Sequence, residues 1–154
     1  ITQINFNETI STTLTVDLPD DSLGNPETFA VTETIDFSTV QQIQDNIDEI
    51  QDATIDALYF EVDNYTGAPD VVATSASLDF DNTSIQIQDI NLQQADDGNT
   101  FFQIDDPAVL SALENALQSS NTVTTVTLNA TLSSTPVLFD VILYLDVTVT
   151  ADAG

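Results

Sequence analysis

The sequence predicts a mainly β protein: a single two-sheet β-sandwich of about seven or eight strands with two short connecting α-helices. Its last long segment, residues 137–150, places an apolar side chain at every second position, which is the alternation of a strand. Similar alternating runs recur along the chain between turn-forming residues. Helical periodicity is confined to two short stretches. A length of 154 residues fits one domain, 1–154.

The strands can be placed in order from their alternation. They are predicted at residues 2–18, 28–37, 53–63, 72–80, 84–92, 100–104, 123–132 and 137–150. Both ends of the domain are therefore long strands, at about 2–18 and 137–150. Residues 53–63 are apolar on both faces, which indicates a well-covered central strand. Residues 72–80 are expected to direct one set of side chains inward: Val72, Thr74, Ala76, Leu78 and Phe80. The short turn between 123–132 and 137–150 predicts that these two strands form a hairpin.

Two helices and two loops complete the prediction. The first helix is expected at 39–51, where Ser38 and Gln41 have the spacing of a capping box. Its apolar stripe would consist of Val40, Ile43, Ile47 and Ile50. The second is expected at 107–119, because Asp106 is suited to the N-cap and Pro107 to the first helical position. Segments 64–70 and 93–99 have the composition of exposed loops.

The charge of the chain excludes several classes of partner. It has no Lys, Arg or His against 26 Asp and Glu, a net charge of −26. Nucleic acids and anionic membrane surfaces are excluded, because binding them requires basic side chains. No apolar run is long enough to insert into a membrane. Resistance to trypsin-like proteases, a high-salt environment and bridging by divalent cations would each explain the composition. All three predict a secreted protein, extracellular or at the cell surface, and the start at Ile1 suggests a processed chain.

The residue types present argue against an enzyme. A nucleophilic Ser or Thr would need a neighbouring base, usually His or Lys, and the sequence has neither. An acidic hydrolase built on two carboxylates is the remaining catalytic hypothesis, but any two of so many acids could lie close together. The sequence therefore predicts no catalytic residue.

Calcium is the ligand that the composition favours, because hard cations prefer clustered oxygen atoms. Two loop-like runs supply the candidates: Asp79, Asp81 and Asn82, and Asp96, Asp97 and Asn99. Each run is also what an ordinary polar turn would contain. Among the sequons of the chain, Asn64-Tyr65-Thr66 falls in a predicted loop, so Asn64 is the expected glycosylation site.

The terminal strands ILYLDVTVT and INFNETISTTLTV, with the Thr, Asn and Asp-rich composition, resemble the secreted β-sandwich subunits of prokaryotic surface fibres. The resemblance implies a structural subunit of a filament, which polymerises with copies of itself by β-strand addition and is held by divalent cations. The expected subunit contacts are the apolar positions of the terminal strands: Ile4, Phe6, Ile10, Leu14, Val16, Val141, Leu143, Leu145, Val147 and Val149. The alternative is a monomeric adhesive or ligand-binding domain of a larger surface protein.

Overall fold

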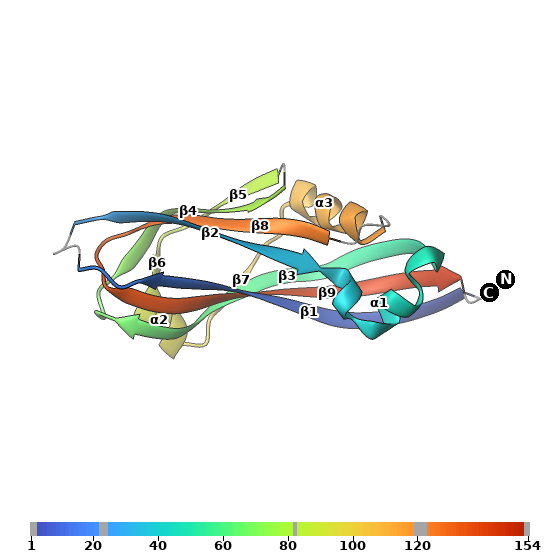
Figure 1. The fold of residues 1–154 in the computed structure, drawn as a ribbon, viewed down its shortest axis with the longest axis horizontal. Coiled ribbons are helices and arrows are strands. Elements are labelled where there is room, and N and C mark those ends of the chain that lie inside the picture. The colour runs from blue at the N-terminus through green and yellow to red at the C-terminus, as the bar shows by residue number, and fades with distance from the viewer. Residues whose placement is uncertain (1–2, 22–24, 82, 119–122, 153–154) are drawn as a thin grey trace.

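The structure is a computed structural model that describes residues 3–21, 25–81, 83–118 and 123–152. Two antiparallel sheets pack face to face and form an elongated sandwich (Figure 1). The sandwich and its mainly β content are as the sequence predicts. No helix in the described ranges combines the length and apolar character needed to cross a membrane.

The first sheet has the strand order β1-β9-β3-β7. Its strands are β1 (Gln3–Leu18), β9 (Val137–Asp152), β3 (Ile50–Gly67) and β7 (Phe101–Gln103). The second sheet has the order β2-β8-β4-β5. Its strands are β2 (Glu27–Asp36), β8 (Val123–Leu132), β4 (Val72–Phe80) and β5 (Thr83–Ile87), with the short β6 (Ile90–Asn91) also paired to β4. The first and last strands lie side by side, and the connections cross between a four-stranded and a five-stranded sheet, which is the arrangement of a jelly roll.

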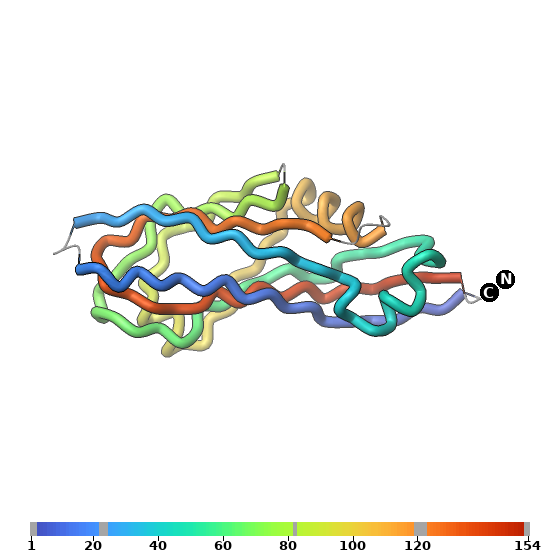
Figure 2. Tube along the Cα trace, in the orientation of Figure 1, coloured from blue at the N-terminus to red at the C-terminus, as the bar shows by residue number. Residues whose placement is uncertain are grey.

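Three helices lie at the margins of the sandwich. They are α1 (Gln41–Asp45), α2 (Leu92–Asp97) and α3 (Pro107–Gln118). The chain trace in Figure 2 shows α1 joining the end of β2 to the start of β3, while α3 precedes β8. Asp106 caps α3 as predicted, because its Oδ1 accepts hydrogen bonds from the backbone N–H groups of Ala108 and Val109.

The core lies between the sheets and is built from the inward side chains of the long strands. On β9 every odd-numbered residue from Val137 to Ala151 is buried. Phe29 of β2 meets Phe139 of β9 edge to face across the sandwich, with ring centroids 6.4 Å apart. From α3, Val109, Leu113 and Leu117 are fully buried, so this helix closes one side of the core. Burial of each such side chain contributes about 1.5–3 kcal/mol.

The predicted hairpin of residues 123–132 and 137–150 is wrong. β8 lies between β2 and β4 in one sheet, whereas β9 lies between β1 and β3 in the other. The connection between them crosses from sheet to sheet, and it is tied to β4 by a hydrogen bond from the Ser133 backbone N–H to the Val72 oxygen (3.0 Å). The two strands face each other across the core because both carry a continuous apolar face, and each finds its hydrogen-bonding partners elsewhere.

The predicted helix at 39–51 is much shorter than expected. A 3₁₀ turn at Phe37–Thr39 precedes α1, a second follows at Ile47–Glu49, and Ile50 already begins β3. The capping box of Ser38 and Gln41 does not form. Instead, Asp36 accepts hydrogen bonds from the backbone N–H (2.9 Å) and hydroxyl (2.6 Å) of Ser38, which starts the 3₁₀ turn and places Val40 at the N-cap of α1 without a side-chain cap.

Three smaller corrections concern two strand ends and the alternation within one strand. β3 extends through the predicted loop to Gly67, with a bulge between Asp63 and Thr66. The predicted strand at 84–92 is divided into two strands, β5 and β6. Leu92 begins α2, which occupies most of the predicted loop at 93–99. In β4 a register shift at Ser75, whose φ is 50°, reverses the alternation, so Ala73 is buried in place of Val72 and Thr74.

Candidate functional site

The side chains that the sequence predicts as subunit contacts lie in the core of the chain itself. Of this set, Ile4 is half-buried and the remainder are buried: Phe6, Ile10, Leu14, Val16, Val141, Leu143, Leu145, Val147 and Val149. β9 also has a strand on each side, β1 and β3, so both of its backbone edges are used. What the terminal strands leave for a neighbouring molecule is therefore the outer backbone edge of β1.

The outer edge of β1 is long and regular. β1 pairs with β9 without interruption from Gln3, opposite Asp152, to Leu18, opposite Val137. Because strand residues alternate in the side to which they direct N–H and C=O, every second residue of β1 presents these groups away from β9. No strand of the described chain pairs with that side. β1 contains no Pro or bulge, and its acids are Glu8 and Asp17, in a chain with 26.

The opposite edge of the same sheet is closed by helix side chains. Beyond the three residues paired with β7, backbone groups of β3 bond to α3 and its flanking chain. The Ile55 N–H donates to Glu114 Oε2 (2.8 Å), and Gln118 Nε2 donates to the Ala53 oxygen (3.3 Å). The Ile104 N–H donates to the Leu58 oxygen (2.8 Å). Covering a strand edge with a helix in this way prevents the edge from pairing with another chain. It does not require the Lys side chains that often protect edges in other proteins.

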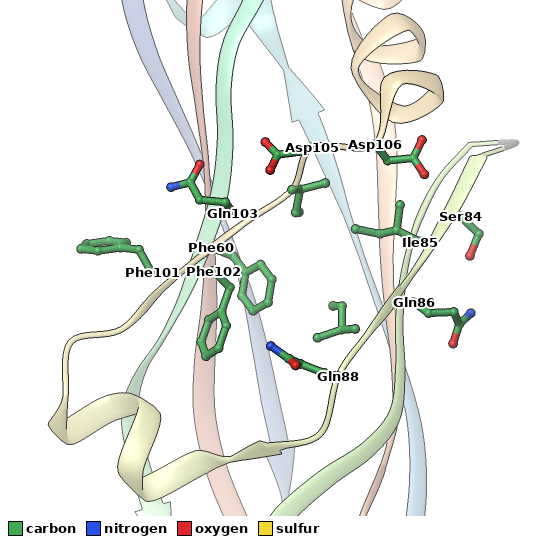
Figure 3. A pocket seen from close by; sticks show the side chains of 12 residues that line it. Phe60, Ser84, Ile85, Gln86, Gln88, Phe101, Phe102, Gln103, Asp105 and Asp106 are labelled. Carbon is green, nitrogen blue, oxygen red and sulfur yellow. The ribbon is translucent and has the colours of Figure 1, made fainter.

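A groove of about 650 Å³ opens between β5 and β7, the short edge strands of the two sheets. Figure 3 shows Phe60 and Phe102 together in this groove, and their rings stack at 4.9 Å with an interplanar angle of 18°. Ile85 and Ile104 also line it, while Asp105 and Asp106 stand at one end. A groove that lies between two backbone edges can accommodate an extended segment of polypeptide.

The predicted calcium ligands serve as hydrogen-bond acceptors at the ends of strands and helices. Asp79 accepts from Ser84 and Asn129, and Asp81 accepts from the hydroxyls of Thr124 and Thr125. The hydrogen bond from Thr124 lowers the pKa of Asp81.

In the second predicted run, Asp96 accepts from the Tyr65 N–H (2.9 Å) and Asp97 from Gln93 (2.9 Å). Asn99 follows α2 with a φ of 47°, and Asn82 lies outside the described residues. Among the residues that the structure describes, no three acidic side chains converge as a metal site would require. Calcium binding stays a prediction.

Asn64 lies at the bulge of β3 rather than in a free loop. Its φ is 56°, its side chain is exposed, and its Nδ2 donates a hydrogen bond to Asp140 Oδ2 (2.9 Å). Attachment of a glycan to this nitrogen would remove one of its donor hydrogens. Glycosylation of Asn64 stays a prediction.

Sequence reasoning missed an aromatic patch on the outer face of the first sheet, formed by Tyr59 of β3, Phe101 of β7 and Tyr144 of β9. The tyrosine rings stack with centroids 5.2 Å apart, and Phe101 lies edge-on to Tyr59 at 5.7 Å and to Tyr144 at 6.2 Å. The Tyr144 hydroxyl donates to Glu61 (2.7 Å), which together with burial raises the pKa of Tyr144 to about 12. The sequence did contain one signal of this patch: Tyr144 is an aromatic residue on the polar face of the last strand.

Comparisons with known proteins add a likeness of shape alone. No protein-family model matches the sequence, and no curated protein matches it. Among solved structures, the crystal structure of the decameric capsid protein of BFDV is similar over 96% of this chain and 99% of that chain, with 11% sequence identity and a TM-score of 0.45. At that TM-score the likeness supports no statement about function.

Proposed function

We propose that this chain is a structural subunit of an extracellular filament and that it assembles with copies of itself by β-strand addition. The observation behind the proposal is the outer edge of β1, which is sixteen residues long and unbulged, with two acids, Glu8 and Asp17. Soluble proteins usually shorten, charge or cover such an edge. Here β3 is covered at the other side of the same sheet, whereas no described strand pairs with the outer edge of β1.

A filament requires two different surfaces on each copy. Pairing β1 with β1 of another copy would be isologous and would close as a dimer, whereas a head-to-tail contact can continue indefinitely. We place the second surface at the β5–β7 groove, on the opposite margin of the sandwich from β1 and β2. In this arrangement β1 of one copy lies along the groove of the next, where the short strands β5 and β7 leave room for another strand.

Electrostatics opposes this assembly in dilute buffer. Each copy has a net charge of −26 and no basic side chain, so contact between copies cannot form Lys or Arg salt bridges. Salt reduces the repulsion because the screening length falls to about 8 Å at 0.15 M ionic strength and about 3 Å at 1 M. Divalent cations would reduce it further by bridging carboxylates. We therefore expect assembly to require salt or calcium.

Electron microscopy and sedimentation of the purified protein, at low and high NaCl and with calcium or a chelator, test the proposal. Ordered filaments that disperse at low salt are expected, and dispersal by chelator alone would assign calcium a bridging role. Single particles under every condition would contradict a filament and favour the adhesive-domain alternative, for which the aromatic patch is the supporting observation.

A pair of isosteric variants locates the contact. Asn5→Asp with Asn7→Asp adds two charges to β1, and the new carboxylates can still accept the hydrogen bonds that Thr150 and Thr148 now donate. Gln42→Glu with Gln44→Glu adds the same charge to exposed positions of α1. Each like-charge pair about 5 Å apart costs about 1 kcal/mol in water. The β1 variant should need more salt to assemble, and an equal response of both variants would argue against β1.

A further inference from the structure

The aromatic patch of Tyr59, Phe101 and Tyr144 lies at the middle of the outer face of the first sheet. Tyr59 and Tyr144 are directly opposite in the register of β3 and β9, and Phe101 reaches them from β7. Phe101 is 52% exposed, the larger fraction of the two exposed large apolar side chains in the described ranges. Phe101 and Phe102 are neighbours on β7, so their side chains point to opposite sides of the strand, and Phe101 lies at the margin of the groove that both line (Figure 3). Phe101 therefore contributes to a surface and not to the core.

Carboxylates flank the stacked rings on two sides. The Tyr59 hydroxyl donates to Asp146 on β9 (3.3 Å), and the Tyr144 hydroxyl donates to Glu61 on β3 (2.7 Å). Each tyrosine thus binds the acid that lies two residues from the other tyrosine. The two hydroxyls are already used as donors, so the patch offers a ligand ring faces and negative charge.

A second acidic pair continues the same row. Asp63 of β3 is directly opposite Asp140 of β9, a placement of like charges that destabilises a sheet when no cation compensates it. Asp140 accepts hydrogen bonds from Thr15 and Asn64, which are both neutral. Nothing in the chain can supply a positive side chain here, because it has no Lys, Arg or His.

We propose that this face binds a basic, extended segment of a partner protein through its Arg and Lys side chains. A guanidinium or ammonium group is attracted to the face of an aromatic ring within about 6 Å of its centroid, and Arg also pairs with carboxylates through two parallel hydrogen bonds. A second copy of the chain cannot be the occupant, since a copy offers only more negative charge. The occupant must therefore be a different molecule that carries cations.

The spacing of the negative groups favours a polypeptide over a small polyamine. Asp140, Tyr144 and Asp146 follow one face of β9, and the strand covers about 20 Å between the first and the last. An extended peptide repeats its side chains on one face every two residues, about 6.7 Å, which is the repeat of this face. Arg at alternate positions would then meet a carboxylate or a ring at each step.

Fluorescence anisotropy with a labelled peptide of alternating Arg and Ser, in physiological salt, tests the proposal. The site variant is Glu61→Gln with Asp146→Asn, whose amide oxygens can still accept from the tyrosine hydroxyls. The matched control is Glu27→Gln with Glu33→Gln, which removes two exposed charges from β2 in the other sheet. Phe101→Ala tests the aromatic contribution with no change of charge, and circular dichroism confirms that each variant is folded.

We expect the site variant to bind about tenfold more weakly, because two charge-assisted contacts are lost. Phe101→Ala should bind about three- to fivefold more weakly, the range of an exposed cation–π contact. The control should change affinity less than about twofold, as a distant surface charge does under screening. Equal losses in site variant and control would overturn the proposal, because the peptide would then be responding to net charge. Equal competition by spermine at the same total charge would contradict a polypeptide occupant.

Discussion

Removing the Glu114 side chain should weaken the fold and uncover a strand edge. Glu114 Oε2 accepts a hydrogen bond of 2.8 Å from the backbone N–H of Ile55, a residue that is 5% exposed. In Glu114→Ala this N–H loses a charged acceptor, and an unsatisfied buried donor costs about 1–3 kcal/mol. Glu114 itself is half-buried, so water can partly replace it as an acceptor. We therefore expect Glu114→Ala to lower the free energy of unfolding by about 1–2 kcal/mol. For a chain of this size that loss corresponds to a decrease in Tm of about 2–8 °C.

Thermal unfolding and amide hydrogen exchange measure the two consequences separately. Glu114→Gln is the matched control, because its amide oxygen can accept the same hydrogen bond and should retain at least half of the stability. The exchange rate of the Ile55 amide should rise in the alanine variant and stay near that of the native protein in the glutamine variant. Native Tm and native Ile55 exchange in Glu114→Ala would refute the interpretation that α3 covers the edge of β3.

Two further predictions concern the core and the tyrosines. Leu143 has no exposed surface, and Leu143→Ala should lower the free energy of unfolding, measured with denaturant, by about 2–5 kcal/mol. Leu138→Ala, on the outer face of the same strand, should lower it by less than about 0.5 kcal/mol. Similar losses in the two variants would contradict the assignment of inward and outward faces of β9. The pKa of Tyr144 is raised from 10.0 to about 12, so the unfolded chain ionises first and the stability contributed by the neutral phenol is lost as pH rises between these values. When the free energy of unfolding is measured across that pH range, it should fall less steeply with pH in Tyr144→Phe than in the native protein. An unchanged slope would argue against the hydrogen bond to Glu61.

The terminal strands could be predicted closely because their alternation is long enough to determine both face and length. The predicted 2–18 and 137–150 correspond to β1 and β9. Periodicity does not reveal which strands pair. β8 and β9 have a short connection and similar patterns, yet the stable arrangement places their apolar faces against each other from different sheets.

Local hydrogen bonds and distant contacts explain the other failures. Asp36 competes successfully with Ser38 as a cap and shortens the predicted helix at 39–51. One residue at Ser75 with positive φ reverses the face of β4, and nothing in the flanking pattern signals it. The aromatic patch joins Tyr59, Phe101 and Tyr144 from three separate strands, so it arises from the topology and is invisible in any single segment.

The most direct test of strand addition is hydrogen exchange of the β1 amides in dispersed and assembled protein. In the dispersed chain, every second amide of β1 faces away from β9 and should exchange quickly, while those bonded to β9 exchange slowly. If β1 pairs with a neighbouring copy, the fast set should become protected on assembly, with little change in β9. Assembled material in which the fast set of β1 amides keeps its dispersed-state rates would contradict the account.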